Sequence, residues 1–287
     1  MKIWDLPTTE KDAIEFLQDR GLLHKTRVCR NGDEMKLYYF QRPVWQCSRC
    51  HQQFGVRNGN WFSNTKLSFV TIVRFMYCWA KELTSIKWCE EQLEIADKTA
   101  IDWNMYLRET CVAALSGKEK KKIGGINFIV EIDESMFSRR KNNVGRPFEQ
   151  QWVFGGICRQ TNECFVVLVP DRKAPTLLKE IEAHIEQGST IYSDSWAGYR
   201  TDAIEEAGFE HFKVNHKYNF VDPETGCNTQ KVERMWGSAK WRNKKHRGTA
   251  RHHLESYFAE FMWRKMIGDG DVFEEIMLAW GKYWPFD

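Results

Sequence analysis

The order of strand-like and helix-like segments after residue 127 constrains the fold of this chain more than any other feature of its sequence. Short apolar segments with strand composition fall at residues 127–136, 151–157, 164–169, 190–193 and 211–214. Segments with helical periodicity fall at residues 174–187, 199–207 and 229–240. Three strands followed by alternating helices and strands predict a mixed sheet with helices on its faces.

This is the element order of a ribonuclease H-like domain, and three acids stand at informative positions in it. Asp133 lies in the first expected strand among isoleucine and valine residues, where an ionised carboxylate costs free energy unless it is paired or metal-bound. Asp194 follows the fourth strand, and Glu233 lies on the helix after the fifth. In such a sheet the first and fourth strands are neighbours and the later helix crosses above them, so the three carboxylates are expected to converge. The alternative is that an aspartate at a strand end only caps the next helix.

Convergent carboxylates repel one another, and divalent cations relieve this repulsion. Mg²⁺ prefers oxygen ligands, and two such ions about 4 Å apart can activate a nucleophile and stabilise the leaving oxygen of a phosphodiester. Asp133, Asp194 and Glu233 are therefore expected to be catalytic and to hold two Mg²⁺ or Mn²⁺ ions for phosphoryl transfer on nucleic acid. Strict alternation puts Glu131 on the face of Asp133 and Glu134 on the other face. Either glutamate could support the metal ligands from behind, although we expect Glu134 to be solvated.

A basic block surrounds and follows Glu233, although the net charge of the 287-residue chain is only +3. The residues expected to contact DNA phosphates are Lys231, Arg234, Lys240, Arg242, Lys244, Lys245 and Arg247. Lys240 lies two helical turns after Glu233, so it shares that face of the helix. The alternative is a solvated helix face that contacts no nucleic acid.

Residues 24–62 are aromatic and glycine-punctuated, and they contain one pair of cysteines, Cys47 and Cys50, with metal-ligand spacing. A zinc ribbon built on this pair would also use Cys29 and His24, and His51 is another possible ligand. The alternative is a ribbon-shaped module that has lost its metal.

Three helices are expected at residues 67–80, 85–93 and 97–115, which is the outline either of a helix-turn-helix that binds DNA or of a plain packing unit. The mixed α+β chain is thus expected to have five parts. They are an N-terminal helix and zinc-ribbon-like module (1–64), a helix-turn-helix region (65–116), a linker (117–126), a ribonuclease H-like catalytic domain (127–252) and C-terminal helices (253–287). No segment reads as membrane-spanning, and nine cysteines that mostly stand singly favour buried thiols over disulfides.

At these residues the chain resembles the Merlin superfamily of DDE transposases and the related bacterial ISXO-type insertion-sequence transposases. The segments that carry the resemblance are WQCSRCHQQF (45–54), GNWF (59–62), EIDE (131–134), YSDSWAGY (192–199) and NTQKVERMW (228–236). The resemblance implies cut-and-paste transposition, with metal-dependent strand cleavage at terminal inverted repeats and strand transfer by the freed 3′-hydroxyl. It implies Asp133, Asp194 and Glu233 as metal ligands, and double-stranded DNA as transposon ends and target. A homodimer or larger assembly on DNA is expected, in the nucleus, or in the cytoplasm if the source is bacterial.

The sequence departs from that family in its first cysteine knuckle, because Cys29-Arg-Asn-Gly32 lacks the usual second cysteine. In some relatives the third catalytic residue is Asn or His, which makes Asn228 a fallback ligand and His216 a weaker one. The competing hypothesis is a domesticated transposase-derived protein that binds specific DNA sequences without cutting them. A structure-selective nuclease of the same fold is a third hypothesis.

Overall fold

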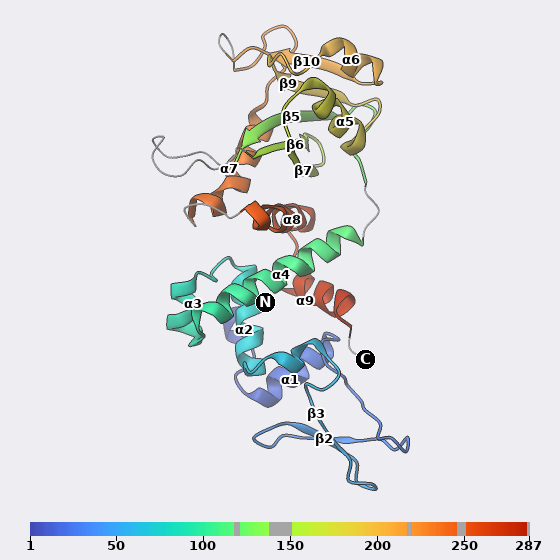
Figure 1. Cartoon of the computed structure of the whole chain (residues 1–287), viewed down its shortest axis with the longest axis vertical. Coiled ribbons are helices and arrows are strands. Elements are labelled where there is room, and N and C mark those ends of the chain that lie inside the picture. Colours follow the sequence, from blue (N-terminus) through green and yellow to red (C-terminus); the bar gives the residue numbers. More distant parts are fainter. Residues whose placement is uncertain (118–120, 138–150, 217, 219, 246–250, 286–287) are drawn as a thin grey trace. The chain divides into compact units, whose positions relative to one another are not determined.

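The chain forms two compact units, Met1–Ala114 with Asp269–Asp287, and Leu115–Gly268 (Figure 1). The computed structural model describes residues 1–117, 121–137, 151–216, 218, 220–245 and 251–285, with the backbone alone at 242–245, 251 and 252. No helix among these residues has the length and apolar character needed to cross a membrane.

A small antiparallel sheet of order β1-β2-β3 forms the ribbon of the first unit. Its strands are β1 (Lys36–Tyr38), β2 (Val44–Gln46) and β3 (Gln53–Gly55). All three strands lie within the aromatic, glycine-punctuated segment 24–62. β3 is defined by its pairing with β2, with Phe54 opposite the buried Trp45.

Helices make up the rest of the first unit. They are η1 (Ile3–Asp5), α1 (Glu10–Asp19), η2 (Trp61–Asn64), α2 (Phe69–Ala80), α3 (Ile86–Leu93), α4 (Asp97–Ser116) and α9 (Val272–Tyr283). Hydroxyl side chains cap three of the α-helices by accepting a first-turn N–H, namely Thr9, Ser68 and Ser85. The three helices expected between residues 67 and 115 are confirmed as α2, α3 and α4, whereas DNA binding by them stays a prediction.

Five strands of the second unit form one mixed sheet of order β10-β9-β5-β6-β7. The strands are β5 (Ile129–Met136), β6 (Trp152–Cys158), β7 (Cys164–Val169), β9 (Thr190–Asp194) and β10 (Glu210–Val214). β5, β6 and β7 are antiparallel neighbours, and β9 and β10 run parallel to β5 on its other side. This is the expected ribonuclease H-like order, with the first and fourth strands side by side.

Helices cover both faces of this sheet. α5 (Ala174–His184) and α6 (Thr201–Glu206) pack their buried residues against Val130 and Ile132 of β5. α7 (Gln230–Lys245) and α8 (Arg251–Ile267) pack on the other face. α7 approaches β6 closely at Gly155, where an added Cβ would lie 3.0 Å from side-chain atoms of Met235 and Trp236.

Two short strands differ from the expected pattern. The helix expected at residues 174–187 ends at His184, because β8 (Ile185–Glu186) pairs in parallel with β4 (Ile123–Gly124). β4 lies inside the segment expected to be a linker. Ser189 ties the two together, since its Oγ accepts the N–H of Gly125 at 2.8 Å.

Candidate active site

Two of the expected catalytic acids stand at the same level on neighbouring parallel strands. β5 and β9 pair in the register Ile129↔Thr190 to Glu131↔Tyr192. Continuing this register places Asp133 opposite Asp194, two residues beyond the paired part of the strands. Side chains at the same level of adjacent parallel strands point to the same face, so the fold brings these two carboxylates together.

Asp133 lies in an acidic and largely buried environment. Burial, together with the neighbouring carboxylates of Glu134, Asp194 and Glu233, raises the pKa of its carboxyl to about 8. The three expected acids are therefore close enough to act on one another electrostatically. Negative charge gathered in this way suits a divalent cation, which would relieve the repulsion.

Asp194 does not cap the next helix, α6, whose N-cap is Arg200, but it makes a local hydrogen bond. Its Oδ1 accepts the backbone N–H of Trp196 at 3.0 Å, which fixes the turn after β9. One oxygen is used in this bond, and the carboxylate therefore retains lone pairs for a metal ion.

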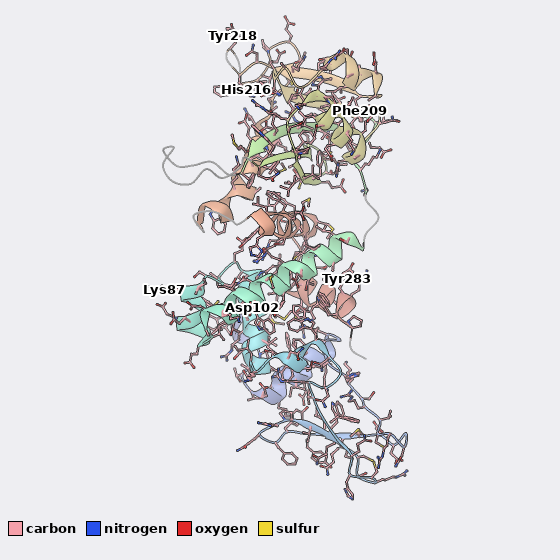
Figure 2. The ribbon with its side chains drawn as sticks, viewed as in Figure 1. Lys87, Asp102, Phe209, His216, Tyr218 and Tyr283 are labelled. Atoms are coloured by element: carbon pink, nitrogen blue, oxygen red, sulfur yellow. The ribbon has the colours of Figure 1, made fainter. Side chains whose placement is uncertain are left out.

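Glu233 lies in the first turn of α7, and its carboxylate is held on one side. The Thr229 hydroxyl donates to Glu233 Oε1 at 3.1 Å, and His216 Nε2 lies 3.5 Å from the same oxygen. His216 Nε2 is also 2.8 Å from Thr229 Oγ1. His216, which follows β10 and is labelled in Figure 2, thus touches the third acid of the expected set.

A buried carboxylate joins α7 to the central strand. Glu131 has no exposed surface, and its Oε1 lies 2.6 Å from Nε of Arg159. Its Oε2 accepts the backbone N–H groups of Lys231 and Val232, at 2.7 and 3.0 Å, in the first turn of α7. Arg159 also donates to the carbonyl of Asn228, just before the helix. We call this set of contacts the α7 clamp, and it fixes the helix that carries Glu233.

The expectation that Glu134 is solvated is wrong. Its side chain is only 6% exposed, and its Oε2 accepts a hydrogen bond from the Tyr199 hydroxyl at 2.5 Å. Arg172 Nη1 lies 3.6 Å from the other oxygen of Glu134, and its guanidinium stacks on Trp196, 3.8 Å from the ring centroid. Burial raises the pKa of Glu134, while the Tyr199 hydrogen bond opposes that rise. Strict alternation along the strand predicts the face of Glu134 correctly. It does not predict that Tyr199 and Arg172 cover this side chain.

The basic residues around Glu233 have different surroundings. Lys240 donates to the Ser135 hydroxyl on β5, so it shares the Glu233 side of α7. Lys231 donates to the carbonyl of Arg159 at 2.6 Å, and Arg234 is exposed. The α7 backbone carries Arg242, Lys244 and Lys245, whose side chains lie outside the described residues, as does all of Arg247.

The ribbon of the first unit gathers three cysteines. The sulfur atoms of Cys29, Cys47 and Cys50 all lie within 4.8 Å of one another. Across the described part of the chain, no other set of three Cys, His, Asp or Glu ligand atoms is that compact. No ring nitrogen of His24 is therefore within 4.8 Å of all three sulfur atoms, and the carboxylates of Asp133, Asp194 and Glu233 are not all within 4.8 Å of one another. Three thiols so close together suit a tetrahedral zinc ion, which binds sulfur at about 2.3 Å.

Two sequence comparisons relate the chain to transposases. Residues 124–265, which include all three acids, match the ISXO2-like transposase domain family. An "Uncharacterized transposase-like protein" of Haemophilus influenzae is 30% identical over 100 residues, which cover 35% of this chain and 78% of that protein.

Two retroviral integrase catalytic cores are among the similar solved structures. The HTLV-2 integrase core, solved with magnesium in a dimeric form, is 14% identical and covers 50% of this chain and 88% of its own, with a TM-score of 0.33. The BIV integrase core is 13% identical and covers 49% of this chain and 84% of its own, also with a TM-score of 0.33. The two sequence matches show that the chain belongs to the ISXO2-like transposase family.

Proposed function

We propose that this chain is a DDE transposase that cleaves DNA strands and joins them to a target with two divalent metal ions. Asp133, Asp194 and Glu233 would hold the ions. The observation that carries the proposal is the parallel register of β5 and β9, which sets Asp133 opposite Asp194 beneath the helix that bears Glu233. Mg²⁺ or Mn²⁺ bound there would activate the attacking oxygen and stabilise the leaving oxygen of a phosphodiester.

The protein's own residues would position these ligands. The α7 clamp holds the start of the helix, and hence Glu233, against β5 through the buried carboxylate of Glu131. The Trp196 N–H holds one oxygen of Asp194, and Thr229 holds one oxygen of Glu233. Each contact orients a carboxylate without using all of its lone pairs, which is how residues around a metal site tune their ligands.

The same proposal assigns the DNA contacts and the assembly. Lys240 and Arg234 on α7, with Lys231, Arg242, Lys244, Lys245 and Arg247 of the basic block, would neutralise DNA phosphates. The substrates would be double-stranded transposon ends with terminal inverted repeats, moved by a cut-and-paste route as in the Merlin group. Two ends must be joined in one event, so we propose a homodimer or larger assembly on DNA.

We further propose that the first unit recognises the transposon ends. Cys29, Cys47 and Cys50 would hold a zinc ion that stabilises the ribbon, and α2, α3 and α4 would act as the helix-turn-helix. The grouping of the three sulfur atoms supports the zinc part of this proposal. The nucleus is the expected site of action in a eukaryotic source.

The test is a cleavage assay with the full chain and a supercoiled plasmid that carries the DNA flanking its gene. Mg²⁺ or Mn²⁺ should produce nicked and linear plasmid, and Asp133→Asn should abolish both products. Arg200→Gln is the control, because Arg200 is exposed and paired with its neighbour Asp202. Cleavage that survives Asp133→Asn would refute the assigned site. Specific DNA binding without cleavage in any metal would instead support the domesticated, non-cutting alternative.

A further inference from the structure

The two turns of the ribbon that carry the cysteines have the same backbone form but different lengths. In the second turn the N–H of Cys47 donates to the carbonyl of Gln52 at 3.0 Å, and His51 has a φ of 60°. In the first turn the N–H of Cys29 donates to the carbonyl of Asp33 at 2.9 Å, and the intervening left-handed residue is Gly32, with a φ of 83°.

The first turn is therefore one residue shorter than the second. Gly32 takes the place of His51 and Asp33 the place of Gln52. Between the cysteine and the left-handed residue the first turn has two residues, Arg30 and Asn31, whereas the second has three, the last of which is Cys50. The first turn therefore supplies one cysteine, and three thiolates would leave one position of a tetrahedral ion open.

The carboxylate of Asp33 lies beside the sulfur of Cys29. Its Oδ2 is 4.0 Å from Sγ of Cys29. In a tetrahedral zinc site, sulfur at about 2.3 Å and carboxylate oxygen at about 2.1 Å from the ion would stand about 3.6 Å apart. Asp33 thus needs to approach the sulfur of Cys29 by a few tenths of an ångström. It must approach at least one of the other two sulfur atoms by more than about 1 Å, because it is not within 4.8 Å of all three.

Arg49 orients this carboxylate from within the other turn. Its Nη1 donates to Asp33 Oδ1 at 2.5 Å, which leaves Oδ2 directed to the sulfur side. Arg49 lies between Cys47 and Cys50, so its ion pair with Asp33 links the two turns. In metal sites, a side chain that binds the metal is commonly held in place by a second side chain in this way.

Other side chains of the ribbon are less well placed. In the described structure neither His24 nor His51 brings a ring nitrogen within 4.8 Å of all three sulfur atoms. Gln52 uses its side-chain oxygen to accept the N–H of Arg30 at 2.8 Å. Asp33 also lies outside the 4.8 Å group, but it contacts one sulfur of that group.

We propose that Asp33 is the fourth ligand of a Cys3Asp site, formed with Cys29, Cys47 and Cys50, that takes a tetrahedral divalent ion such as Zn²⁺. The inference rests on the zinc binding proposed above and goes beyond it, because it names the residue that replaces the missing cysteine. It also gives Arg49 a positioning role toward Asp33.

The test is a Co²⁺ titration of the metal-stripped full chain, followed by competition with Zn²⁺. The wild-type chain should bind one Co²⁺ with tetrahedral d–d absorption and a charge-transfer band of three thiolates. Asp33→Asn should weaken Zn²⁺ binding by at least about tenfold, and Asp33→Cys should restore tight binding with the charge-transfer intensity of four thiolates. Asp19→Asn is the control, because Asp19 forms an exposed ion pair with Lys25 in the same unit.

The outcomes separate the two proposals. A wild-type chain that shows no tetrahedral Co²⁺ absorption and no thiolate charge-transfer band would refute the zinc site itself. A wild-type chain that binds Co²⁺ with three thiolates, while Asp33→Asn binds it equally well and with the same spectrum, would refute Asp33 as ligand and leave the zinc site standing. Circular dichroism of each variant separates loss of a ligand from loss of the fold.

Discussion

The α7 clamp makes a quantitative prediction, because one buried carboxylate serves two groups of donors. Glu131 faces Arg159 with Oε1 and the first turn of α7 with Oε2. Glu131→Gln keeps the shape of the side chain but removes its charge. The new amide group must also present its own N–H atoms to one of the two groups of donors, so those contacts become repulsive.

The expected loss of stability follows from the burial of the pair. Removing one partner of a buried ion pair costs about 3–5 kcal/mol, because the other charge is left uncompensated. The Arg159 side chain is 22% exposed, so water replaces part of what it loses. We therefore expect Glu131→Gln to lower the free energy of unfolding of the second unit by about 3 kcal/mol, the lower end of that range.

The assay is urea denaturation followed by circular dichroism, with amide hydrogen exchange at Lys231 and Val232 as the local probe. Glu163→Gln is the matched control, because its partner Lys121 is 78% exposed and such pairs contribute at most about 1 kcal/mol. Glu131→Gln should unfold at clearly lower urea and lose protection at the two amides. Equal stability of the two variants, with protection at α7 retained, would refute the clamp.

Three further changes test other parts of the second unit. Burial lowers the pKa of His211 to about 4, so the unfolded chain binds more protons as pH falls from 6.5 to about 4. Over that range the free energy of unfolding should fall by up to about 3 kcal/mol because of this residue. Denaturation measured at several pH values should show a smaller fall in stability for His211→Gln than for the wild type. The same pH dependence in both would contradict the lowered pKa of His211. Gly156→Ala places a Cβ 2.6 Å from the Phe165 ring and should cost about 1–3 kcal/mol in thermal unfolding, whereas an unchanged melting temperature would show that the sheet adapts freely. Tyr199→Phe removes the hydroxyl that donates to Glu134 and should cost about 1.5–3 kcal/mol, so a loss below 0.5 kcal/mol in urea denaturation would argue against that bond.

The strands and acids of the second unit could be predicted because their signals are local. β7 begins and ends where its apolar segment does, at Cys164 and Val169. Asp133 drew attention as a carboxylate within an apolar strand, and Asp194 as one at the end of a strand. Their juxtaposition follows from the strand order and register, without any knowledge of side-chain contacts.

Features that depend on distant pairing could not be predicted in this way. Residues 185–186 continue a helical pattern, but their pairing with β4, some sixty residues earlier in the chain, turns them into a strand. Glu134 reads as a solvated residue of an alternating strand, yet Tyr199 and Arg172 bury it. The partners of Glu131 lie up to 101 residues away, so its face was evident but its role was not. The shortened first turn of the ribbon likewise emerges only from the backbone hydrogen bonds of Cys29 and Cys47.

The central claim is that Asp133, Asp194 and Glu233 hold divalent ions, and anomalous diffraction from crystals soaked in saturating Mn²⁺ tests it most directly. We predict a Mn²⁺ peak between the carboxylates of Asp133 and Asp194, at about the 2.0–2.2 Å distance of oxygen ligands, with Glu233 turned toward it or toward a second ion. Crystals of Asp133→Asn should lack the peak. Wild-type crystals without a Mn²⁺ peak at these carboxylates, or the same peak in Asp133→Asn crystals, would contradict the account.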